Sequence, residues 1–289
     1  MPAGLRGLAG FLHRRPRVRL GLLLAGPLGW LGIAYLGSLA VLFLAAFWQL
    51  DSFTGEVVHE YGFQNFETIV DQDVYRTIAL RTVGIAAAVT ITDIVLAFPI
   101  AFYMAKVATP RVRALLVVGV LMPLWCSYLV KVYAWRTILS EEGILNWALE
   151  PLGLSGPGFG NTATWIVFSY LWLPYMVIPI YAGLERLPAS LIDASSDLGA
   201  HTWTTFRRVV LPIVFPAVVA GSIFTFSLTL GDYIAPTLVS STQFIGNVVY
   251  SNVGVANNLP LAAAFATVPV VIMVVYLLIA RRLGAFENL

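Results

Sequence analysis

Acidic and aromatic residues inside otherwise apolar stretches are the part of this chain that could do chemistry. Asp93 lies deep within one apolar run, and Asp232 and Tyr233 end another. A charged side chain is costly in hydrocarbon, so such residues mark pairing sites or solute pathways. Carboxylates flanked by apolar walls would attract a passing cation. These residues indicate transport of a solute, in which no bond is made or broken.

Asp93 has two interpretations. Counted from Ile78 at about 1.5 Å per residue, it lies roughly 22 Å along its helix, beyond the midplane of a bilayer. It could form part of the wall of a translocation path. It could instead be a structural acid, hydrogen-bonded to Thr90, to Thr92 or to another helix.

Asp232 and Tyr233 also have two interpretations. They follow Pro212 by about twenty residues, which places them near the outer mouth of a membrane-crossing helix. They could line a gate at that mouth. Alternatively, Asp232 could be an acid that ends a helix at the interface.

The chain shows no pattern of an enzyme. His13, His59 and His201 are far apart, and none has a second ligand type at metal-binding spacing. There is no Gly-x-x-x-x-Gly-Lys phosphate loop and no Gly-x-Ser-x-Gly nucleophile elbow. We therefore expect no cofactor in this chain, and any ATP hydrolysis must take place in another subunit.

A polar interruption over residues 193–216 separates two apolar stretches. Pro188 suits the start of a helix, Leu198 its last turn, and Gly199 a left-handed stop. A helix of about eleven residues is marginal in water by itself. Its apolar face needs either the lipid surface or another subunit. The residues of that face are Leu187, Leu191, Ala194 and Leu198.

Composition indicates a membrane protein. Hydrophobic residues make up 59% of the chain and charged residues 11%, against about 25% charged in soluble domains. Prolines recur within the apolar runs and predict bent helices around a cavity. Six runs are long enough to cross a bilayer: residues 20–48, 78–105, 114–135, 162–184, 213–234 and 261–280.

Basic residues predict the orientation, because cytoplasmic loops concentrate Lys and Arg. They precede the first run, lie between runs two and three and between four and five, and follow the sixth. Acidic residues dominate the other loops. We therefore expect cytoplasmic residues 1–19, a transmembrane domain over 20–284 and a cytoplasmic tail over 285–289. The net charge of +2 is explained by this bias and does not indicate a nucleic-acid partner.

The polar interruption resembles the EAA loop of ABC-importer permeases. The likeness rests on Asp193-Ala194-Ser195, Gly199-Ala200 and Leu211-Pro212, with Asp in place of the usual Glu. It implies a cytoplasmic coupling loop over 185–212 that docks an ATPase, which would bind ATP and Mg. The contact residues it implies are Leu191, Asp193, Ala194, Ser195, Leu198, Gly199 and Ala200.

Three further segments, residues 62–78, 128–146 and 231–250, resemble the first permease subunit of spermidine/putrescine transporters. The last contains the Asp-Tyr pair, Asp232 and Tyr233, followed by a proline. Ser240-Ser241 departs from the Gly-Gly usual in that group. The resemblance implies a polyamine as cargo, but the same permease class also imports iron(III), sulfate and thiamine.

The resemblance implies an all-α membrane protein of the type I ABC-importer permease fold, with six transmembrane helices and both termini in the cytoplasm. Its partners would be a second permease subunit, an ATPase dimer and an extracytoplasmic solute-binding protein, in the inner membrane of a bacterium. The rival classes are a secondary transporter, which would need an ion-coupling site and an internal repeat, and a structural membrane protein.

Overall fold

Long apolar helices dominate the computed structural model, which describes residues 16–51 and 53–282. Five are long and apolar enough to cross a membrane, and a bent pair brings the number to six. They are Pro16–Ala45, Asp73–Val107, the pair Pro110–Trp125 and Tyr128–Leu139, Asn161–Arg186, Thr202–Gly231 and Leu259–Arg282.

Several of these helices contain more than one element. The first consists of α2 (Pro16–Trp30), a π-helical stretch η1 (Leu31–Leu36) and α3 (Gly37–Ala45). The second joins α5 (Asp73–Phe102) to the π-helical η2 (Tyr103–Val107). The fifth joins α11 (Thr202–Thr205), the π-helical η4 (Phe206–Val210) and α12 (Leu211–Gly231). The others are α9 (Asn161–Arg186) and α15 (Leu259–Arg282).

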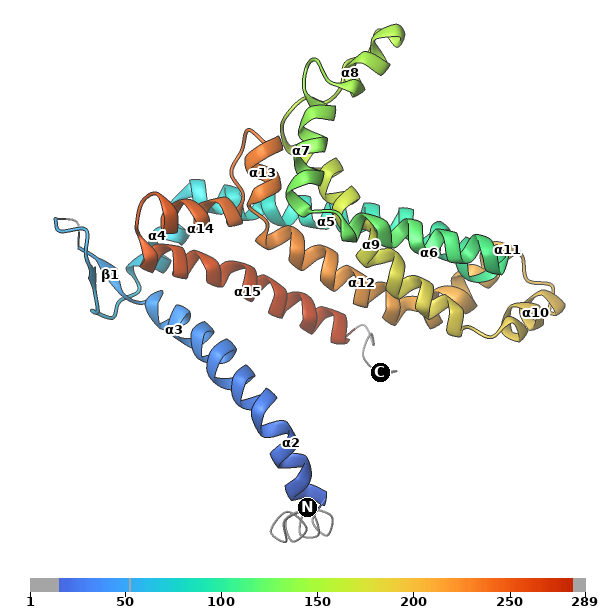
Figure 1. Ribbon diagram of the computed structural model, residues 1–289, viewed down its shortest axis with the longest axis horizontal. Helices are drawn as coiled ribbons and strands as arrows, with labels where there is room; N and C mark the ends of the chain where they lie inside the picture. The colour runs from blue at the N-terminus through green and yellow to red at the C-terminus, as the bar shows by residue number, and fades with distance from the viewer. Residues whose placement is uncertain (1–15, 52, 283–289) are drawn as a thin grey trace, which may run out of the picture.

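The centre of the protein is the packing of α5, α9 and α12 against one another (Figure 1). Their main core cluster includes Ala97, Met176, Ile180 and Val214, all essentially without exposed surface. The backbones approach closely because small residues lie at the contact. A Cβ built on Gly183 would lie 2.7 Å from that of Ala217 on α12.

The first membrane helix leaves this body. Only 6% of the residues in its apolar 18-residue stretch are buried, and Figure 1 shows the helix diverging from the others from α3 toward α2. Its C-terminal end is anchored, where Ala45 and Ala46 pack with Ala263 and Ala264 of α15. The remaining apolar surface therefore faces lipid or another chain.

The third predicted span, residues 114–135, is not one straight helix. α6 (Pro110–Trp125) ends two residues after Pro123, and α7 (Tyr128–Leu139) begins at an angle of 93° to it. Cys126 and Ser127 have extended backbones between them. Proline removes a backbone donor near this break, and α7 then packs on α13 (Ile234–Val239) in place of continuing the span.

Short elements cap the end of the body where α5 begins. A two-stranded antiparallel hairpin, β1 (Gln49–Leu50) and β2 (Val57–Val58), precedes α4 (Gln64–Asp71). Backbone N–H groups of Phe53 and Thr54 donate to Asp51 in the hairpin turn and lower its pKa. α14 (Ile245–Gly254) packs beside α15 at the same end.

Two features project from the body. α7 carries α8 (Ile144–Leu149) and a 3₁₀ turn, η3 (Glu150–Leu152), on an arm that stands clear of the helices (Figure 1). At the end opposite the hairpin, α10 (Ala189–Asp197) joins α9 to α11. The short helix predicted before Gly199 therefore exists, with Pro188 immediately preceding its first turn.

Candidate functional site

The loop around α10 closes with a Schellman motif. Gly199 has φ +77°, and its N–H donates to Ser196 O at 2.9 Å while the N–H of Ala200 donates to Ser195 O at 3.1 Å. These two bonds satisfy carbonyls that the end of a helix otherwise leaves unpaired. The left-handed conformation explains why glycine stands at this position.

The exposed side of α10 carries most of the residues that the sequence assigned to coupling. Leu191 is 42% exposed and Leu198 88% exposed, and Asp193 and Ala194 are exposed beside them. Apolar side chains exposed this far into water mark an interaction surface when they gather on one short element. Gly199 ends that surface with open space around its Cα.

Two predicted residues, Ser195 and Ala200, lie on the inner side of the loop and are half-buried. The hydroxyl of Ser195 lies 2.9 Å from that of Thr205 on α11, so it ties α10 to the start of the fifth membrane helix. Its role in this structure is to position the loop. Leu187, predicted on the apolar face, is buried in the core below α10.

The loop is fastened to the ends of three membrane helices. Lys106 of η2 donates to Leu187 O at 2.6 Å. Arg113 of α6 donates to Met104 O at 3.0 Å, and its guanidinium lies 3.8 Å from the carboxylate of Glu185. These contacts link the ends of α5, α6 and α9 beside the residue that precedes Pro188 and α10.

Sequence reasoning missed the aromatic groove beside α10. Trp203 is 69% exposed, and its ring stacks on Phe206 at 5.3 Å. A groove of about 690 Å³ lies between α5 and the loop. The sequence contained one signal for this groove, which is the position of Trp203 within the polar interruption. The lining residues of this groove include Phe98, Phe102, Ile192, Trp203 and Phe206.

Asp93 is enclosed by its own chain. It has no exposed surface, and neither carboxylate oxygen has a hydrogen-bond partner among the described residues. Thr90 donates to Ala86 O, and the hydroxyl of Thr92 accepts from Trp165 Nε1 at 3.0 Å. The hydrogen bonds to Thr90 and Thr92 considered for Asp93 are therefore absent from this structure.

Asp232 lies directly after α12 and organises the turn between α12 and α13. Its Oδ1 accepts from the backbone N–H groups of Ile234 at 2.8 Å and Ala235 at 3.0 Å. Its Oδ2 accepts from the hydroxyl of Tyr128 on α7. Asp232 thus ends one helix, starts α13 and holds the arm that begins at α7.

Tyr233 lies beside Asp232 and is partly exposed. Its ring stacks on Tyr250 of α14, with the centroids 4.6 Å apart and the planes 11° from parallel. Asn247 donates to Tyr233 O at 3.0 Å. The structure therefore places Asp232 and Tyr233 together in the turn between α12 and α13, whereas Asp93 lies within α5.

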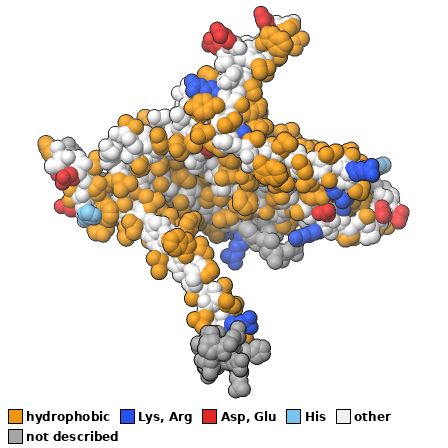
Figure 2. Space-filling view, in the orientation of Figure 1, with side chains coloured by type: hydrophobic (Ala, Val, Ile, Leu, Met, Phe, Trp, Pro, Cys, Tyr) orange, Lys and Arg blue, Asp and Glu red, His pale blue; other side chains and the backbone are white. Residues whose placement is uncertain are grey.

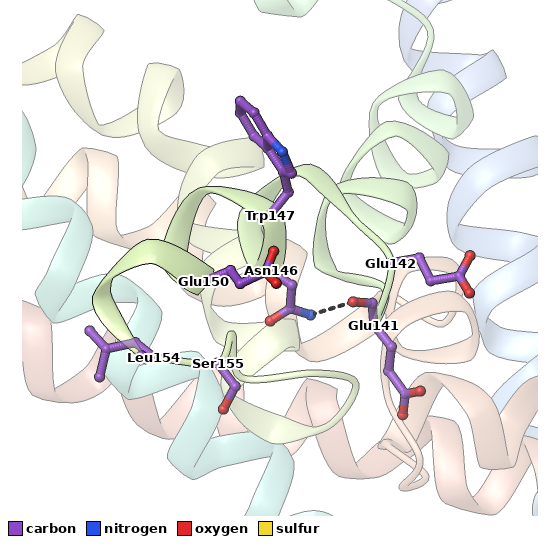
Figure 3. Close-up of a pocket in the computed structure, with 8 residues that line it drawn as sticks. Glu141, Glu142, Asn146, Trp147, Glu150, Leu154 and Ser155 are labelled. Carbon is purple, nitrogen blue, oxygen red and sulfur yellow. Dashed lines mark hydrogen bonds between the residues drawn. The ribbon is translucent and has the colours of Figure 1, made fainter.

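The arm contains an open pocket of about 590 Å³. Asn146 fixes its loop, because its amide donates to Glu141 O at 3.1 Å and accepts from Gly156 N at 2.5 Å. Figure 3 shows the carboxylates of Glu141 and Glu142 pointing in different directions. Within residues 16–51 and 53–282, no three His, Cys, Asp or Glu side chains are placed to hold a metal ion.

Comparison with known proteins identifies the family. Residues 78–286 match the inner membrane component of binding-protein-dependent transport systems, which is well over half of the chain. The chain belongs to this family. It is an ABC-importer permease subunit, a multi-pass protein of the inner membrane.

The relatives of this permease are transport permeases and not enzymes. The inner membrane ABC transporter permease protein YdcU of Escherichia coli (strain K12) is 46% identical over 302 residues, covering 99% of this chain and 96% of the relative. The spermidine/putrescine transport system permease protein PotB of Haemophilus influenzae is 30% identical over 220 residues, covering 74% and 77%.

Solved structures show the fold. A chain of the bacterial alginate ABC transporter, in complex with an alginate pentasaccharide-bound periplasmic protein, aligns with a TM-score of 0.73 at 16% identity, covering 95% of this permease and 97% of that chain. A chain of the MetNI methionine ABC transporter aligns with a TM-score of 0.56 over 73% and 94%. The predicted type I ABC-importer permease fold is confirmed.

We predict that Tyr128→Phe loosens the arm from α13, because it removes the hydroxyl that donates to Asp232. A charge-assisted hydrogen bond of this kind contributes about 1.5–3 kcal/mol. The permease should melt at a lower temperature in detergent, and Asp232→Asn should lower it too. In the double variant the two losses should not add. Fully additive losses would show that the pair contributes no coupling.

Proposed function

We propose that this permease imports polyamines of the spermidine and putrescine class. Its partners would be a second permease subunit, an ATPase dimer that binds ATP and Mg, and an extracytoplasmic solute-binding protein. The support for this cargo is the similarity to PotB proteins, at 30% identity in Haemophilus influenzae and 29% in Escherichia coli. The two alignments cover 77% and 84% of the length of these relatives, respectively.

The observation that carries the docking proposal is the exposed apolar surface of α10. Leu191 and Leu198 project from a helix of nine residues with no buried side chain. Such a helix has too few contacts of its own to be stable, yet the Schellman motif and the Ser195–Thr205 contact give it one defined shape. An ATPase groove is the partner that would cover it.

The proposed orientation places α10 and both termini in the cytoplasm. Figure 2 shows Lys and Arg together with some Asp and Glu at the end of the body that carries α10, and Asp and Glu at the tip of the arm. This distribution agrees with the enrichment of basic residues on the cytoplasmic side of membrane proteins. It would put the hairpin, α14 and the arm outside.

Asp232 and Tyr233 would lie at the outer end of the translocation path. Their turn joins α12 to α13 and is fixed by the contacts to Tyr128 and Asn247. Asp93 would come into contact with cargo only if α5 moved relative to α9 and α12, because these helices enclose it. We propose that such a movement accompanies the change between outward-open and inward-open states.

Uptake measurements test the cargo. Cells that carry the complete transporter and no other polyamine importer should accumulate radiolabelled spermidine or putrescine, and deletion of this permease should abolish the uptake. Excess sulfate, thiamine or iron(III) should not compete. Equal polyamine uptake with and without the permease would contradict the proposed cargo.

Gly199 tests the coupling loop. Gly199→Val should uncouple ATP hydrolysis from uptake, because a β-branched residue is strained at φ +77° and the Schellman motif would open. Gly199→Asn is the matched variant, since asparagine tolerates this conformation. We expect uptake to fall about tenfold in the valine variant and less than threefold in the asparagine variant, with normal insertion of both. Full solute-stimulated ATPase activity in Gly199→Val would argue against docking through α10.

Cysteine labelling tests the orientation. In a Cys126→Ala background, a cysteine replacing Ser196 should react with an impermeant thiol reagent only after the cells are opened. A cysteine replacing Glu142 should react in intact cells. Both positions are exposed in the structure, so access depends on the side of the membrane. The reverse pattern would show the opposite topology.

A further inference from the structure

Four aromatic rings form a continuous series, the aromatic ladder, across α7, α9 and α12. The ring of Tyr128 stacks on Trp172 with centroids 6.1 Å apart. Trp172 lies 6.0 Å from Tyr175, and Tyr175 stacks on Phe224 at 6.4 Å. Aromatic pairs at these separations stabilise a protein. Three successive ring pairs that connect α7, α9 and α12 are more than the packing of two helices against each other requires.

The aromatic ladder runs inward from the turn between α12 and α13. Its outer end is fixed because Tyr128 donates to Asp232. Phe224 precedes Asp232 by eight residues on α12, which corresponds to about 12 Å along the helix axis. The ladder therefore extends from the proposed outer mouth into the membrane-crossing part of the protein.

From Trp172 to Phe224, exposure increases along the aromatic ladder. Trp172 is 8% exposed and Phe224 is 53% exposed, with Tyr175 between them. Trp172 Nε1 has no hydrogen-bond partner among the described residues, so its ring is positioned by packing alone. The series thus has a rigid buried centre and an accessible ring face at its inner end.

Charged side chains of both signs lie near the outer end of the aromatic ladder. Asp232 accepts from Tyr128, and Lys131 lies one helical turn along α7 from Tyr128. At the inner end, a cation would interact with the ring faces of Tyr175 and Phe224. A cation over an aromatic face gains between about twofold and thirtyfold in affinity, depending on how far it is desolvated. Several such positions attract a cation without holding it as strongly as a buried carboxylate would.

We propose that the aromatic ladder is a track of cation–π sites for the ammonium groups of an organic amine, with the alkyl segments between those groups packing on the rings. This assignment rests on the proposed polyamine cargo and adds the residues that would conduct it. Phe224 and Tyr175 are the rings that contact the cargo directly, while Trp172 positions Tyr175.

Substitution of the accessible rings tests the track. Phe224→Leu and Tyr175→Leu should each lower the rate of spermidine uptake at low concentration about three- to tenfold. Phe224→Tyr should retain the wild-type rate, because the ring face remains. Tyr35→Leu, at an exposed aromatic residue of the diverging first helix, is the control and should have no effect. Assembly of the transporter and its basal ATPase activity should be unchanged in Tyr35→Leu, and uptake by every variant is compared per assembled transporter.

Fluorination separates a ring-face interaction from packing. Phenylalanine analogues with one, two and three fluorines at position 224 progressively weaken the negative potential of the ring face with little change in shape. Spermidine uptake should fall stepwise along this series. Because Phe224 is exposed, these variants distinguish a ring-face interaction from packing even if Tyr175→Leu fails to assemble.

The outcomes distinguish the track from the cargo proposal. If the wild type takes up polyamines and Phe224→Leu or fluorination leaves the rate of uptake unchanged, the track is overturned and the cargo proposal stands. Absence of polyamine uptake by the wild-type transporter would overturn both. Loss of uptake in Phe224→Leu, its retention in Phe224→Tyr and a stepwise response to fluorination would together support the track.

Discussion

The close packing of α5, α9 and α12 is the constraint on which the rest of this permease depends. Helices in a bilayer gain little from hydrophobic burial against one another, because lipid is as apolar as the side chains. Their association relies on close fit, which Gly183 supplies against Ala217 and Gly221 against Met176. The α10 loop, the turn that contains Asp232 and the arm all begin at the ends of these three helices or of helices packed on them.

The parts that carry function are the places where helices stop. Inside a membrane an unpaired backbone group is costly, so each interruption needs its own partners. The α10 loop uses Gly199, Ser195 and a lysine of η2 for this purpose. The turn between α12 and α13 uses Asp232, whose two oxygens serve α13 and α7. Each interruption therefore has one defined geometry.

Asp93 and the aromatic ladder have different properties inside the bundle. Asp93 is enclosed and unpaired among the described residues, so a change in packing around it would have a large electrostatic consequence. The ring faces of the aromatic ladder are apolar, while the hydroxyl of Tyr128 at one end donates to Asp232. The ladder reaches the surface of the bundle at Phe224. Weak binding of the cargo suits a translocation path, because the path must release what it binds.

The sequence by itself determined the class of protein, the number of apolar runs and the place of the short helix before Gly199. Hydrophobic length and the pattern from Pro188 to Gly199 are local properties, and local geometry sufficed to predict the left-handed conformation of Gly199. The break of the third span near Pro123 was only partly visible, because a proline can bend or end a helix and the choice depends on what the following segment packs against.

Tertiary structure alone decided which polar residues are enclosed and which rings meet. Thr92 proved to bind Trp165 on another helix, and Asp232 proved to bind Tyr128 across more than a hundred residues of sequence. Tyr128, Trp172, Tyr175 and Phe224 read separately as ordinary membrane aromatics. Only the crossing of α7, α9 and α12 sets them in one series, because the register between helices depends on side-chain packing and not on local periodicity.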